Sequence, residues 1–128
     1  MTVVLRLRLE LLPTDRGGRR RPVTDGYRAS LSFGRRRRGD AEPVVHDAVL
    51  VLEGADTLAP GATGVARAWV LLGDELPRAL DDGAVFTLLE GDRIVARAEL
   101  LGRYEDPSPH ALRDLAAAKA RVLEPGSR

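Results

Sequence analysis

The side chains in this chain that could do chemistry are mostly arginines, and they cluster in its first third. Residues 1–38 carry eleven arginines against three acidic residues, a charge of 11 − 3 = +8, whereas residues 39–128 carry nine basic and sixteen acidic residues, 9 − 16 = −7. Such an asymmetry indicates an anionic partner for the basic third. The planar guanidinium group donates paired hydrogen bonds that suit phosphate. The candidate RNA-binding residues are therefore Arg19, Arg20, Arg21, Arg28, Arg35, Arg36, Arg37 and Arg38.

Two alternatives to phosphate binding stay open for these arginines. The chain has one lysine, one isoleucine and neither asparagine nor glutamine, a pattern that codon bias in a GC-rich coding sequence produces by itself. Only the clustering of the arginines therefore counts as evidence of function. In addition, Arg19 and Arg28 could brace a long loop by donating hydrogen bonds to its carbonyl groups.

Candidates for catalysis or metal binding are few. The chain has no cysteine, and its two histidines, His46 and His110, are far apart in the sequence. Ser30 and Ser32 have no nearby base, and no GxxxxGK[ST] phosphate loop is present. We therefore expect a protein that is not an enzyme, with no catalytic residue, no metal ligand and no cofactor.

The elements that must position the arginines are β-strands. Residues 3–12 and 27–33 alternate apolar and polar side chains, which is the pattern of half-buried strands. Further strands are expected at 44–52, 62–72, 84–89 and 94–101. Six strands separated by turn signals predict an all-β fold, a six-stranded antiparallel Greek-key-like barrel.

The expected core consists of large apolar side chains on the inward faces of these strands: Leu7, Leu9, Leu31, Phe33, Leu50, Phe86 and Leu88. The strand at 62–72 has an ambiguous inward face, because two sets compete for it. One set is Ala66, Ala68, Val70 and Leu72, and the other is Val65, Trp69 and Leu71.

Beyond the strands, residues 110–123 are expected to form one added α-helix, with Ser108 as N-cap and Pro109 in its first turn. Its apolar face would hold Leu112, Leu115, Ala116, Val122 and Leu123. Such a helix packs on its own domain or docks on a partner. We therefore divide the chain into a barrel domain at residues 1–104 and a helical extension at 105–128.

Nothing in the sequence indicates a membrane or a secretory route. No run approaches the roughly 20 apolar residues that span a bilayer, and Arg6 and Arg8 interrupt the apolar start of the chain. The expected location is the cytoplasm.

The loop between the first two expected strands has the sequence GGRRRPVTDGYR. It resembles the GGR-x-x-P-x-x-[Asn/Asp]-GYR segment that opens the C-terminal β-barrel, domain III, of the elongation factor Tu family. The matching residues are Gly17, Gly18, Arg19, Pro22, Asp25, Gly26, Tyr27 and Arg28. Later turns match the same barrel over residues 3–103, at Pro60-Gly61, at Asp82-Gly83 with Phe86, and at Glu90-Gly91-x-Arg93-x-Val95. A loop-shaping role is expected for Gly17, Gly18, Pro22, Gly26 and Tyr27.

The resemblance implies a binding domain rather than a GTPase. In the family this barrel follows a GTPase domain and another barrel, packs against both, and touches the T-stem backbone of aminoacyl-tRNA. Neither preceding domain is part of this sequence, so we expect no GTP binding. The chain also departs from the family, because Ala29-Ser30 replaces Pro-Gln, Arg20-Arg21 is more basic, two connections are longer and the C-terminal helix is extra.

Two functions from different classes follow. The first is a non-enzymatic module that binds tRNA-like RNA backbone in a translation-related role. The alternative is a protein-interaction barrel that docks on a GTPase-like or other acidic protein partner. No membrane partner is expected in either case.

Overall fold

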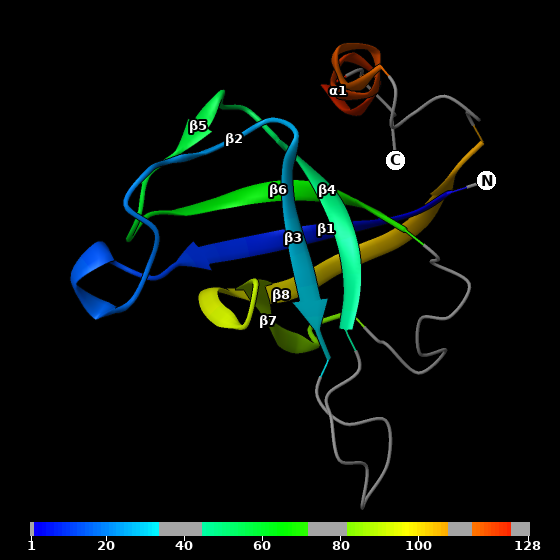
Figure 1. The fold of residues 1–128 in the computed structure, drawn as a ribbon. Coiled ribbons are helices and arrows are strands. Elements are labelled where there is room, and N and C mark those ends of the chain that lie inside the picture. The colour runs from blue at the N-terminus through cyan, green and yellow to red at the C-terminus, as the bar shows by residue number, and fades with distance from the viewer. Residues whose placement is uncertain (1, 34–44, 72–81, 108–113, 124–128) are drawn as a thin grey trace, which may run out of the picture.

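Six antiparallel strands close into a barrel in the computed structural model, which describes residues 2–33, 45–71, 82–107 and 114–123 (Figure 1). The barrel strands are β1 (Thr2–Leu11), β3 (Tyr27–Ser32), β4 (Val45–Leu52), β6 (Thr63–Val70), β7 (Val85–Glu90) and β8 (Arg93–Asp106). The other elements are a 3-10 turn η1 (Thr14–Arg16), the short strands β2 (Val23–Thr24) and β5 (Thr57–Leu58), and the helix α1 (Leu115–Leu123). This confirms the predicted all-β barrel with one added helix.

The strand order around the barrel is β1-β6-β4-β3-β7-β8, and β8 returns to pair with β1. Strands β3, β4 and β6 follow one another in sequence and in space, while β1 lies beside β6, which is a Greek-key arrangement. The chain between β1 and β3 must therefore cross one end of the barrel. That crossing segment carries the arginine-rich loop, with η1 and β2 at the same end (Figure 1).

The barrel interior is filled by the inward side chains of all six strands. Six of the seven expected core residues are buried: Leu7, Leu9, Leu31, Leu50, Phe86 and Leu88. The expectation was wrong for Phe33, which is only partly buried. Phe33 follows the last residue of β3, so it packs on Phe86 at the barrel end, with ring centroids 4.6 Å apart.

Both candidate faces of β6 are covered, which resolves the ambiguity of that strand. Ala66, Ala68 and Val70 belong to the barrel core, whereas Trp69 belongs to a second buried cluster outside it. Because side chains alternate along a strand, Trp69 must lie on the outer wall. Leu72 lies outside the described residues.

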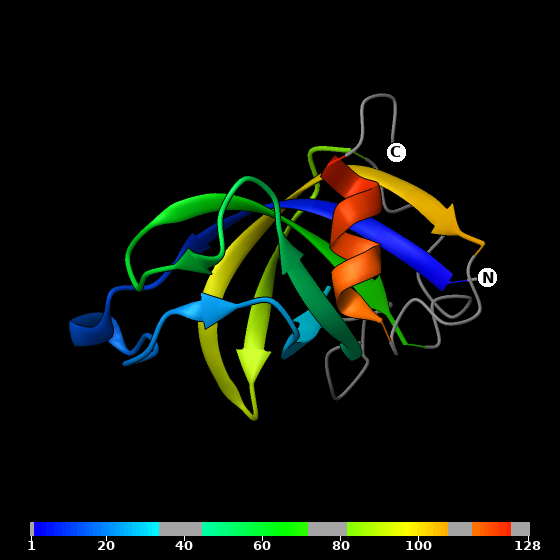
Figure 2. The ribbon, with the colours of Figure 1, turned by 90° about the horizontal axis from the view of Figure 1, so that it is seen from above.

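The helix α1 packs on that outer wall and covers Trp69 together with Val4 and Val51 (Figure 2). Its N-cap is Asp114, whose Oδ1 accepts a hydrogen bond of 3.0 Å from the Ala117 amide. Leu115 is half-buried, but the expectation that Ala116 faces the barrel was wrong, because Ala116 is exposed and Ala118 is buried instead. Ser108, Pro109 and Leu112, and the side chains of Val122 and Leu123, lie outside the described part.

The last barrel strand is longer than expected. β8 continues to Asp106, beyond residue 101 and beyond the expected domain boundary at 104. Its pairing with β1 shifts register between Arg6 and Leu7, so a bulge interrupts the alternation that the sequence pattern relied on. Among the described helices, none is long and apolar enough to cross a bilayer.

Candidate nucleic-acid interface

The arginine-rich loop is shaped by glycines that no other residue could replace without strain. Gly17 ends η1 with φ of 90°, and Gly26 turns the chain into β3 with the same φ, a conformation that L side chains rarely adopt. At Gly18, a Cβ atom would lie 2.0 Å from the carbonyl oxygen of Leu12, so there is no room for a side chain. Pro22 lies exposed just before β2.

Arg19 is the most enclosed arginine of the loop. Its guanidinium carbon lies 4.4 Å from the centre of the Tyr27 ring, and its Nε donates to the carbonyl of Arg21 at 3.2 Å. Its Nη1 also forms an ion pair with Glu90 Oε1, and only 18% of the side chain is exposed. Arg19 therefore braces the loop.

Glu90, at the end of β7, is the common acceptor at this end of the barrel. It accepts hydrogen bonds from the Tyr27 hydroxyl at 2.9 Å and from Arg93 at 3.2 Å, in addition to Arg19. Burial alone would raise the pKa of Glu90, but the Tyr27 hydrogen bond and the charge of Arg19 outweigh it and lower that pKa. Burial, followed by the hydrogen bond to Glu90, raises the pKa of Tyr27. Glu90 is thus ionised at neutral pH and holds Arg19.

Arg20 and Arg21 differ from Arg19 because they are exposed. Neither side chain forms a hydrogen bond or ion pair with any residue that the structure describes. Together with Arg19, Glu90 and Arg93 they line a shallow depression of about 320 Å³. Four arginines and one glutamate give this depression, named here the loop hollow, a charge of 4 − 1 = +3.

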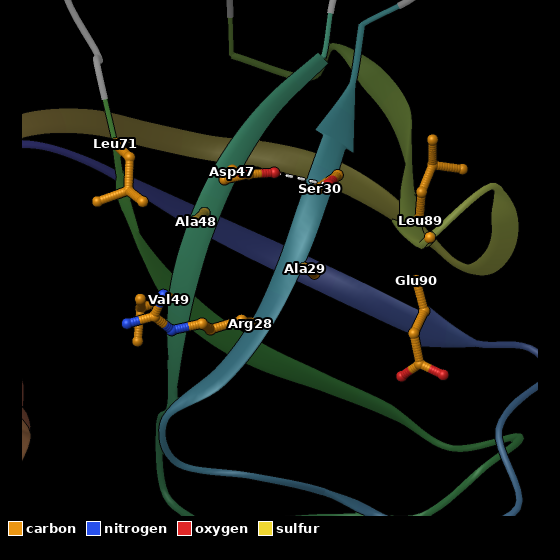
Figure 3. A pocket seen from close by; sticks show the side chains of 10 residues that line it. Arg28, Ala29, Ser30, Asp47, Ala48, Val49, Leu71, Leu89 and Glu90 are labelled. Carbon is orange, nitrogen blue, oxygen red and sulfur yellow. Dashed lines mark hydrogen bonds between the residues drawn. The ribbon is translucent and has the colours of Figure 1, made fainter.

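Arg28 lies on a neighbouring depression of about 190 Å³, formed by the outer faces of β3, β4 and β7. Figure 3 shows its side chain extending across β4 toward Val49 and away from Glu90. Ser30 Oγ donates to Asp47 Oδ1 at 2.7 Å in the same depression, so the expectation that no base lies near Ser30 was wrong. The two depressions meet at Glu90, so Arg28 borders the loop hollow without pointing into it. Arg35, Arg36, Arg37 and Arg38 lie outside the described residues.

The arginines of β1 and β6 are used elsewhere. Arg6 and Arg67 both bind Glu53, at 2.9 and 2.6 Å, and Arg8 binds Glu99 at 3.1 Å. Burial alone would raise the pKa of Glu53, but hydrogen bonds from both arginines outweigh it and lower that pKa. Because these arginines are paired with glutamates, they add no unpaired positive charge to the loop hollow.

Glu90 and Arg93 were missed as site residues by the sequence reasoning. They were noted only as part of the Glu90-Gly91-x-Arg93 turn, although that turn and the GYR segment belong to one resemblance. The structure joins the two segments through Arg19 and Glu90, which are 71 positions apart.

Neither known protein-family models nor curated proteins match this chain. Within the described ranges, no cluster of three or more His, Cys, Asp and Glu side chains could hold a metal ion.

Proposed function

We propose that this protein is a non-catalytic module that binds RNA through the phosphate backbone, in the manner implied by the barrel of the elongation factor Tu family. One observation carries the proposal. Arg20 and Arg21 are exposed and lack partners among the described residues, and they lie beside Arg93 in a hollow of net positive charge. Unpaired guanidinium groups in such a hollow suit phosphate oxygens.

The neighbouring contacts give the loop the rigidity that a binding surface needs. Arg19 is fixed by Tyr27, Glu90 and the Arg21 carbonyl, so the backbone that carries Arg20 and Arg21 is held in place before binding. A preorganised surface loses less conformational entropy when it binds. The Tyr27 ring is covered by Arg19, so it offers no platform on which a base could stack. The expected mode is backbone contact without sequence readout.

A translation-related role rests on the resemblance. The two segments that resemble the elongation factor Tu barrel, the glycine loop and the closing hairpin, meet at Glu90. A shared interaction between distant matching segments supports common ancestry better than either segment alone.

The test is a salt titration of binding to tRNA and to an unrelated RNA duplex. Replacing Arg20 and Arg21 by serine should weaken binding to both RNAs alike. It should also reduce the slope of log affinity against log salt by about 1.4–1.8, since each lost phosphate contact removes about 0.7–0.9. Replacing Arg35 to Arg38 by serine tests the remaining candidates in the same way.

The matched control removes two positive charges elsewhere. Arg8 and Arg97 line a separate depression that also contains Glu10 and Glu99, so their replacement by serine should leave the slope unchanged. An equal loss of RNA affinity and of salt slope in both double variants would mean that only the net charge matters. An unchanged RNA affinity in all variants would contradict the RNA proposal.

The alternative, a protein-interaction barrel, is favoured by the depression beside Arg28. This surface combines the apolar side chains of Leu71 and Leu89 with Asp47 and Arg28 (Figure 3), which is the mixed composition of a protein interface. A GTPase-like or other acidic protein that binds the chain but not an Arg28→Glu variant would support it.

A further inference from the structure

The outer wall of the barrel carries a row of buried apolar side chains where a solvent-facing surface should be polar. Val4, Val51 and Trp69 lie on β1, β4 and β6, and each is at most 1% exposed. Val4 is directly opposite Trp69 on one side and Tyr104 on the other, so the row crosses β8, β1 and β6. We name this surface, formed by Val4, Val51, Trp69 and Tyr104, the outer apolar face.

The outer apolar face is held in place by the barrel itself. Trp69 Nε1 donates to Asp106 Oδ2 at 2.9 Å, and the Tyr104 hydroxyl accepts from Arg67 at 2.7 Å. Arg67 is in turn bound to Glu53. None of these bonds involves α1, so the polar atoms of the face keep their partners whether or not the helix is present.

The cover of this face is the short helix α1 (Figure 2). α1 has nine residues, and helices of this length are marginal in water without packing. Among its described side chains, Ala118 is fully buried and Leu115 is half-buried, whereas Ala116 and Ala120 are exposed. Of these side chains, Ala118 and Leu115 therefore supply the apolar contact with the face.

Charged contacts also fix α1 on this face. The Lys119 ammonium group donates to Asp25 Oδ2 at 2.6 Å, to the Ala55 carbonyl at 2.8 Å and to Asp56 Oδ1 at 3.3 Å. The other oxygen of Asp25 accepts from the Leu52 amide at 2.8 Å. Asp25 is thus oriented by the barrel and is ready to receive a cation from any helix laid on the outer apolar face.

We propose that the outer apolar face is a docking site for an amphipathic helix of a partner protein, and that α1 occupies it in cis as a competing ligand. The partner helix would present an apolar residue, a small apolar residue three positions later and a lysine at the next position. This is the spacing of Leu115, Ala118 and Lys119, which places the three on one helical face. The site shares no residue with the loop hollow, and the inference goes beyond the proposed RNA binding.

Trp69 is the only tryptophan of the chain and lies in this face, so its fluorescence shows whether α1 covers the face. The first experiment measures acrylamide quenching of Trp69 fluorescence in the full chain and in a Lys119→Glu variant. Trp69 of the variant should be quenched several-fold more strongly, because the attraction between Lys119 and the two carboxylates of Asp25 and Asp56 is replaced by repulsion. An Arg97→Glu variant carries the same charge change at an exposed position and should behave as the wild type.

The second experiment supplies the helix in trans. A blocked peptide with the sequence of residues 114–123, DLAAAKARVL, should bind the Lys119→Glu chain at least tenfold more tightly than the wild type, since the cis competitor is displaced. The same peptide with Lys119→Glu should not bind. Circular dichroism checks that the barrel is intact, and Ala118→Glu serves as a second variant if Lys119→Glu does not fold.

Three outcomes would overturn the proposal. One is unchanged Trp69 quenching in both folded variants, which would make α1 a permanent part of the barrel. Another is peptide binding that is absent or equal in wild type and variants. The third is a concentration-dependent dimer of the wild-type chain that the peptide dissociates, which would assign the face to α1 of a second copy instead.

Discussion

Two glutamates organise the arginines of this protein, and they do so in the same way. Glu90 binds Arg19 and Arg93, and Glu53 binds Arg6 and Arg67. In each cluster one arginine also lies against a tyrosine ring, Arg19 on Tyr27 at 4.4 Å and Arg67 on Tyr104 at 5.3 Å. An arginine with both a carboxylate and an aromatic partner is held by geometry as well as charge.

Replacing Arg19 by alanine should therefore destabilise the fold. The change removes an ion pair, a cation–π contact and a hydrogen bond to the loop, and we expect a loss of about 1–2 kcal/mol in the free energy of unfolding. Urea denaturation measures it. Arg21→Ala, an exposed neighbour, should change stability by less than about 0.5 kcal/mol. Equal effects of the two variants would mean that Arg19 does not brace the loop.

Glu53 should make stability depend on pH. Its pKa is lowered in the folded state, so its contribution is present above the unfolded pKa of about 4.3 and is lost as pH falls through the folded value. Melting temperatures of the wild type and of Glu53→Gln are measured between pH 3 and pH 7. At neutral pH the variant should melt at a lower temperature than the wild type, and this difference should narrow below about pH 4. A gap of constant size would contradict the role assigned to this carboxylate.

At the scale of the elements, β1 supplies three different surfaces from one alternating strand. Its leucines point into the barrel. Its Arg6 binds Glu53, the residue after β4, and its Arg8 binds Glu99 of the neighbouring strand β8. Its Val4 lies under α1. Alternation predicted the first two surfaces. It could not predict the third, because an outward valine is buried only if a distant element covers it.

β7 is a short strand that places two large side chains, Phe86 and Leu88, in the barrel core. Phe86 is 5% exposed, whereas its neighbour Val85 is 54% exposed. Phe86→Ala should lower the free energy of unfolding by about 3–5 kcal/mol, because it leaves a cavity in the core. Val85→Ala should cost less than about 0.5 kcal/mol. Chemical denaturation of both variants checks this, and a small effect of Phe86→Ala would show that the barrel end does not need it.

How much of this structure the sequence could predict depends on how far apart along the chain the interacting residues lie. The strands, the turns and most of the core follow from periods of two residues and from glycine positions, which are local. The pairing of Arg19 with Glu90 joins residues 71 positions apart, and no local spacing encodes it. The end of β8 was misplaced because the register shift beyond Arg6 breaks the local pattern.

At the scale of the whole molecule, ion pairs within the fold neutralise part of the charge asymmetry along the chain. Arg6, Arg8 and Arg19 come from the basic first third, and their partners Glu53, Glu99 and Glu90 come from the acidic remainder. Some of the asymmetry that indicated an external anion is therefore satisfied within the fold. Among the described arginines of that third, Arg16, Arg20, Arg21 and Arg28 remain for a partner.

The chain should not bind GTP. The sequence contains no phosphate-binding loop of the GxxxxGK[ST] type, and its only lysine, Lys119, is bound to Asp25 and Asp56. Isothermal titration calorimetry should detect no micromolar binding of GTP by this chain, and ATP serves as the control for weak attraction of any triphosphate to the loop hollow. Micromolar binding of GTP but not ATP would contradict this prediction.

The closed barrel limits how this protein can meet others. Each of its six strands is hydrogen-bonded to a neighbour on both sides, so the barrel wall has no free strand edge. Open edges are where proteins recruit an extra strand from another chain, and where they aggregate. The barrel wall is closed to both events. A partner that binds the barrel wall, whether nucleic acid or protein, must therefore engage its side chains and not a strand edge.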